Sequence, residues 1–71
     1  MDLFELKEAY KGEKDSKVKA RMLMMIKLKE GLTAYQVAKE FLYPQSNVVK
    51  WKKRFKSEGI KGLSDSRLYY P

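Results

Sequence analysis

The sequence predicts an all-α fold, a small bundle of about four helices. Its 71 residues are enough for one domain only. Apolar residues recur three or four positions apart in four successive segments, as they do on one face of a helix. Each segment is bounded by residues that cap or break helices. We therefore expect helices at about residues 2–10, 16–30, 34–41 and 45–57.

The first helix is predicted from one apolar face. Leu3, Leu6 and Tyr10 lie at i, i+3 and i+7, so they point to the same side. Asp2 can cap the N-terminus of this helix. Gly12 is expected to break it, because glycine is a poor helix former.

The second helix is apolar on all sides at its centre. It is expected to begin at Asp15 or Ser16, either of which can serve as the N-cap, and to be ended by Gly31. Residues 22–26 read Met-Leu-Met-Met-Ile and leave no polar face. A helix of this kind is covered on more than one side. We therefore place it in the middle of the bundle.

The third and fourth helices are delimited by local signals. Thr33 and Gln36 have the spacing of a capping box. Pro44 cannot continue the third helix, but it suits the start of the next one. Gly59 stops the fourth helix. The apolar residues beyond it are expected to fold back over the end of that helix: Ile60 and Leu63.

Two short helices joined by a tight turn form the helix-turn-helix layout. The first of the pair supplies small and apolar residues where the second crosses it, namely Val37, Ala38 and Phe41. Tyr43 is expected to act as the apolar plug of the turn. The domain is expected to span residues 1–66, with a turn at residues 64–66 and an extended tail at residues 67–71.

The fourth helix is expected to bury one narrow stripe and to expose the opposite one. At about 100° per residue, the members of the buried stripe fall within about 60° of one another around the helix axis. Its members are Val48, Trp51 and Phe55. The outward stripe is polar and basic, with one methyl-bearing residue: Ser46, Val49, Lys50, Lys53 and Ser57. A recognition helix in the major groove of DNA presents a face of this kind.

Positive charge is concentrated on this part of the chain. The formal net charge is +7, from 16 basic and 9 acidic residues. Residues 41–57 contain five basic residues and no acidic one. Such a patch suits a phosphate backbone or an anionic membrane surface. The alternative is a solvated lysine face that binds nothing.

The composition argues against several classes of protein. The sequence contains no cysteine and no histidine, so we expect no metal site, no cofactor and no enzymatic activity. No apolar run approaches the ~18 residues of a membrane span, and no secretory signal opens the chain. We expect a cytoplasmic, nucleoid-associated protein without a membrane partner.

Candidate contacts to DNA fall into two groups. The first turns of the fourth helix reach base edges most easily, and glutamine can pair with adenine; the candidate base contacts are Gln45, Ser46, Val49 and Lys50. The candidate phosphate contacts are Thr33, Tyr35, Lys52, Lys53, Arg54 and Lys56. Plainer roles are also open, since Thr33 can act as a cap only and Gln45 can be satisfied by water.

The chain resembles the N-terminal helix-turn-helix region of transposases of the IS630/Tc1-mariner superfamily, a paired-like and homeodomain-like module. Residues 19–33, QVAKEF at 36–41, VVKWKKRF at 48–55 and EGIKGLSD at 58–65 carry the resemblance. The chain departs from that family at Leu42, where glycine is usual, and at Pro44, where serine is usual. The family's Gly-Arg-Pro element after this region, which enters the minor groove, is replaced by a tail in which Arg67 is the candidate contact.

These patterns and the resemblance together predict a domain that binds double-stranded DNA through a major-groove recognition helix. The resemblance implies a transposase-like protein. A stand-alone transcriptional regulator built on the same module is the alternative, and a protein-interaction bundle is a further one. One such domain covers a small footprint, so we expect a homodimer or an additional DNA-binding domain to supply useful specificity.

Overall fold

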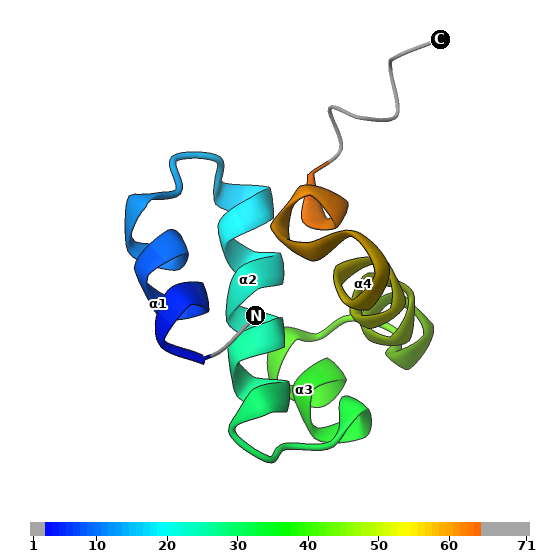
Figure 1. Ribbon diagram of the computed structural model, residues 1–71. Coiled ribbons are helices and arrows are strands. Elements are labelled where there is room, and N and C mark those ends of the chain that lie inside the picture. Colours follow the sequence, from blue (N-terminus) through cyan, green and yellow to red (C-terminus); the bar gives the residue numbers. More distant parts are fainter. Residues whose placement is uncertain (1–2, 65–71) are drawn as a thin grey trace, which may run out of the picture.

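The computed structural model describes residues 3–64 and contains four α-helices followed by a short 3-10 helix (Figure 1). The described residues include no strand, and the predicted all-α class is confirmed. The elements are α1 (Leu3–Gly12), α2 (Ser16–Lys29), α3 (Ala34–Phe41), α4 (Gln45–Glu58) and η1 (Gly59–Leu63). The expected cap at Asp2, the end of the expected turn at residues 64–66 and the expected tail at residues 67–71 lie outside the described residues.

The second helix lies in the middle of the bundle, as its apolar centre predicts. α2 packs against every other element, with α1 on one side and α3, α4 and η1 on the other (Figure 1). Met22, Met24, Met25 and Ile26 are all buried in the core. Because α2 presents apolar side chains in all directions, it can hold α1 and the α3–α4 pair at once. No helix within residues 3–64 is both long and apolar enough to cross a membrane.

Hydrogen bonds from side chains fix the starts of α2 and α3. The carboxylate of Asp15 accepts hydrogen bonds from the backbone N–H groups of Lys17 and Val18, at 2.9 and 3.3 Å. Thr33 Oγ1 accepts from the N–H of Gln36 at 3.1 Å, and Gln36 Oε1 accepts from the N–H of Thr33 at 2.9 Å. These bonds satisfy donors that a helix start otherwise leaves open. The observed α3 begins where the capping box predicts.

The first helix is longer than expected. α1 includes Gly12, where the sequence predicts a break. Glycine in a helix costs only about 1 kcal/mol relative to alanine. A Cβ on Gly12 would meet nothing within 4 Å, so the last residue of α1 lies in open space. Glycine is therefore a weak stop signal here.

The chain reverses sharply after α4. Gly59 has a φ of 72°, which ends the helix, and η1 follows at once. Leu63 in η1 is fully buried and Ile60 packs on the core, so the predicted folding-back of this segment is observed. The 3-10 geometry itself has no counterpart in the predicted elements. Gly62 is also buried, because η1 lies directly on the backbone of α4.

The turn between α3 and α4 places a leucine in left-handed geometry. Leu42 has φ 59° and ψ 36°, and its side chain is 89% exposed. The prediction that Tyr43 plugs this turn is wrong, since Tyr43 is 43% exposed. Its ring tilts against that of Phe41, with 6.3 Å between the centroids. Phe41, the last residue of α3, packs against the core instead of Tyr43.

Replacing Leu42 with glycine is expected to stabilise the domain. A residue with a Cβ costs about 1–2 kcal/mol in the left-handed region, and the exposed side chain contributes little packing. Glycine adds entropy to the unfolded chain, so a net gain of about 0.5–1 kcal/mol is expected. Thermal unfolding followed by circular dichroism measures it. Leu42→Ala is the control, because alanine keeps the Cβ and should not raise the melting temperature.

Candidate nucleic-acid interface

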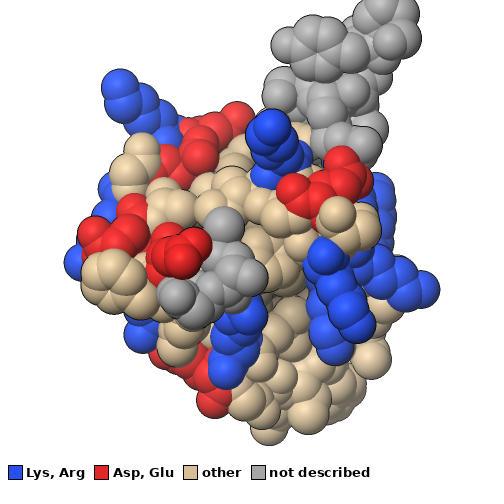
Figure 2. All heavy atoms as spheres, in the orientation of Figure 1, with Lys and Arg blue, Asp and Glu red and all other residues tan. Residues whose placement is uncertain are grey.

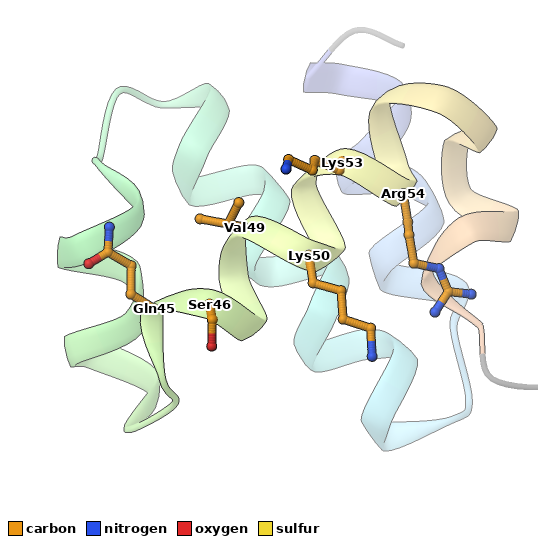
Figure 3. Close-up of a pocket in the computed structure, with 6 residues that line it drawn as sticks. All are labelled: Gln45, Ser46, Val49, Lys50, Lys53 and Arg54. Atoms are coloured by element: carbon orange, nitrogen blue, oxygen red, sulfur yellow. The ribbon is translucent and has the colours of Figure 1, made fainter.

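One shallow hollow runs along the outward side of α4. It has a volume of about 740 Å³ and is lined from this helix alone (Figure 3). Its residues are Gln45, Ser46, Val49, Lys50, Lys53 and Arg54, and we call this set the α4 face. The opposite side of the helix is buried through Val48 and Trp51, with Phe55 half-buried beside them. The predicted division of α4 into a buried and an exposed stripe is therefore observed.

The α4 face changes character along the helix. Gln45 and Ser46 are neutral, exposed and lie in the first turn of α4, while Val49 is half-buried. Lys50 and Lys53 follow further along, and both are exposed. In Figure 3, Lys53 lies on the same edge of the helix as Val49, and Lys50 extends from the other edge. The structure thus brings the four predicted base-contact residues together at one end of one surface.

Charge is unevenly distributed over the molecule. Figure 2 shows most acidic side chains on the side of α1, and a group of lysine and arginine side chains along the edge formed by α4, with one acidic group above them. The residues that line the α4 face include three cations and no carboxylate. Within residues 3–64, ion pairs join other parts of the surface, such as Lys7 to Glu30 at 3.2 Å. The positive potential of the α4 face is therefore not neutralised by its own lining.

Arg54 differs from the other predicted phosphate contacts because the fold already uses it. Its guanidinium lies 4.6 Å from the centroid of the Trp51 ring, and Nη2 donates to the carbonyl oxygen of Ser64 at 3.5 Å. Its Nε is buried without a hydrogen-bond partner among the described residues. The residue is only half-exposed at one end of the hollow. It supports η1 against α4 and adds charge to the edge of the face.

Lys52 and Lys56 lie on another side of α4. Both are exposed, and they line a cleft of about 460 Å³ between α2 and α4. Lys29 of α2 is on the same cleft, and apolar residues such as Phe55 form its floor. The predicted phosphate contacts therefore do not form a single surface. They divide between the α4 face and this neighbouring cleft.

The N-terminus of α3 holds two more predicted phosphate contacts. Thr33 accepts a hydrogen bond within the capping box, and its hydroxyl can still donate one. Tyr35 is 60% exposed, with Lys39 Nζ 5.9 Å from the centroid of its ring. The first-turn N–H groups of a helix favour an anion. Arg67, the remaining predicted contact, lies outside the described residues.

Arg21 is a residue that the sequence reasoning missed. It stands on α2, and its guanidinium lies 4.0 Å from the centroid of the Trp51 ring. Its Nη1 donates to the carbonyl oxygen of Leu63 at 3.0 Å, across 42 residues of sequence. Arg21 therefore joins α2, α4 and η1 behind the candidate interface. Nothing in the local sequence signals this role, because α2 also carries Lys17 and Lys19 just before Arg21.

The α3–turn–α4 unit, held on α2 and presenting a basic outward helix face, defines a helix-turn-helix domain. A family model described as the homeodomain-like domain matches residues 15–64, which is more than half of the chain, so the protein belongs to the homeodomain-like family. A helix-turn-helix domain of this kind binds DNA with its second helix in the major groove. Searches of curated proteins and of solved structures each returned no significant match.

Proposed function

We propose that the domain binds double-stranded DNA with the α4 face in the major groove, as the DNA-binding domain of a transposase-like protein. The observation that carries this is the order of residues along that face. Neutral side chains that can meet base edges lie in the first turns, and lysines that can meet phosphates follow. The hollow contains no carboxylate that would repel the backbone.

The distribution of charge favours this function over a protein-interaction bundle. The core of a protein–protein interface is depleted in lysine, whereas the α4 face carries Lys50 and Lys53. We also propose a non-catalytic role for the domain, on the ground that the sequence offers neither histidine nor cysteine as acid, base or nucleophile. A second copy or a further domain would supply the footprint that one recognition helix lacks.

Two substitutions on the α4 face distinguish sequence-specific base contacts from nonspecific contacts to the phosphate backbone. Gln45→Ala should lower affinity for a preferred site by about 1–3 kcal/mol and leave random duplex nearly unaffected. Lys53→Ala should weaken binding to all duplexes about equally and reduce the salt slope by roughly 1. The preferred site is first selected from a random library, and affinities are then measured by fluorescence anisotropy. Both residues are exposed, so neither change should affect folding.

Two results would contradict this assignment. Selection that enriches no motif would mean that the domain binds DNA without sequence preference. Equal weakening of every duplex by Gln45→Ala would remove that residue from the set of base contacts.

A further inference from the structure

A second pocket lies beside the α4 face, between the N-terminal half of α2 and α4. It has a volume of about 340 Å³. We call it the α2–α4 pocket, and its residues are Lys17, Arg21, Tyr43, Asn47, Lys50 and Trp51. Lys50 is the one residue that these six share with the lining of the α4 face. The pocket is thus a neighbouring site rather than a part of the recognition surface.

The lining of this pocket has the chemistry of an anion site. It combines three cations with the Asn47 amide and the Tyr43 hydroxyl, and the six residues include no carboxylate. Lys17 and Lys50 are exposed, and within residues 3–64 neither forms an ion pair with a carboxylate. Two lysines close together that form no ion pair with a carboxylate raise the local positive potential. Every polar side chain in the set can donate a hydrogen bond.

The inner wall of the pocket is fixed before any ligand binds. Arg21 is stacked 4.0 Å from the centroid of the Trp51 ring and bonded to the carbonyl of Leu63 at 3.0 Å. Lys50 Nζ lies 5.1 Å from the centroid of the same ring. Two of the positive charges that line the pocket therefore lie against one buried indole. A preorganised site loses less conformational entropy when it binds.

We propose that the α2–α4 pocket binds a backbone phosphate of the same duplex, with Lys17 of α2 as its principal contact. This inference rests on the proposed function, because it places the phosphate at the side of the groove that α4 enters. The pocket borders the α4 face at Lys50, so a helix seated in the groove brings one sugar-phosphate strand to this side. Lys17, which is 28 positions or more from every residue of α4, becomes a part of the interface.

Three variants test the pocket in duplex-binding titrations at several salt concentrations. Lys17→Ala should lower affinity by on the order of tenfold at about 0.1 M salt and reduce the salt slope by about 1 for all duplexes. Asn47→Asp should weaken binding more strongly, because it adds a negative charge to the pocket. It should not unfold the protein, since an acid in the first turn of a helix is favourable. Lys14→Ala is the matched control: Lys14 is exposed, lies three residues before Lys17 and lines none of the pockets described.

The outcomes distinguish the pocket from the function on which it rests. Lys17→Ala and Asn47→Asp acting as expected, with the Lys14→Ala slope unchanged, would support the phosphate site. If Lys17→Ala and Lys14→Ala give the same salt slope while Lys53→Ala still reduces it, the proposed phosphate site is ruled out. DNA binding by the α4 face is then still supported. If wild-type protein binds no duplex at low salt, the proposed function and the pocket both fall.

Discussion

Replacing Trp51 with alanine is expected to leave the domain largely unfolded at room temperature. The side chain is 7% exposed in the centre of the α4 contact, and removing a core tryptophan costs about 3–5 kcal/mol. A single core in a domain of this size rarely supplies more than about 3–5 kcal/mol. The mutation also removes the ring on which Arg21 and Arg54 stack. Far-UV circular dichroism and thermal unfolding measure the loss.

Trp51→Phe is the control for this prediction. It keeps an aromatic ring on the core side of α4, so it should remain folded with a lowered melting temperature. A folded Trp51→Ala variant that loses only binding to single-stranded DNA would contradict the assignment. In that case Trp51 would be a platform for stacking bases rather than a core residue.

Replacing Gly62 with alanine is the second change expected to have a large effect. A Cβ at this position would lie 2.5 Å from the carbonyl oxygen of Arg54 and 3.2 Å from the Cβ of Glu58. The first of these atoms belongs to the backbone of α4 and cannot rotate away. η1 must then move off α4 and carry Leu63, which is fully buried, out of place. Overpacking of this kind costs about 1–3 kcal/mol.

Gly12 provides a matched control for Gly62. A Cβ on Gly12 would meet nothing within 4 Å, and the residue is the last of α1. Gly12→Ala is therefore expected to be neutral or to stabilise by about 0.5 kcal/mol. Chemical denaturation of both variants measures the difference. Equal stability of the two would mean that η1 does not pack closely on α4.

Local signals account for the parts of the fold that the sequence predicts well. The capping box at Thr33 and Gln36 fixes the start of α3, and Gly59 fixes the end of α4. The apolar centre of α2 predicts its place in the middle of the bundle, because it leaves no face for solvent. These predictions need only neighbouring residues or helical periodicity.

Features that depend on distant contacts could not be predicted in this way. η1 forms where Leu63 is buried and where Gly62 lies on the backbone of α4, and both are tertiary conditions. Phe41 packs against the core while Tyr43, two residues later, is exposed. The stacking of Arg21 on Trp51 joins two helices through residues that are 30 positions apart in the chain. None of these contacts leaves a local pattern in the sequence.

The sequence predicts which residues lie on the α4 face better than it predicts the contacts that those residues make. Helical periodicity places Ser46, Val49 and Lys53 on one outward face, and the structure shows them there. Helical periodicity does not reveal that Arg54 already contacts Trp51 and the end of η1. Lys17 comes to lie beside α4 only because α2 and α4 pack against each other.

The salt dependence of duplex binding tests the central claim most directly. Each phosphate that a lysine or arginine neutralises releases counterions, and the slope of log K against log salt is about −0.9 per contact. With about five such contacts, the wild-type protein should bind duplex DNA at low salt with a slope of about −4 to −5. An affinity that does not change with salt, or no binding at low salt, would contradict the proposal that this domain binds double-stranded DNA.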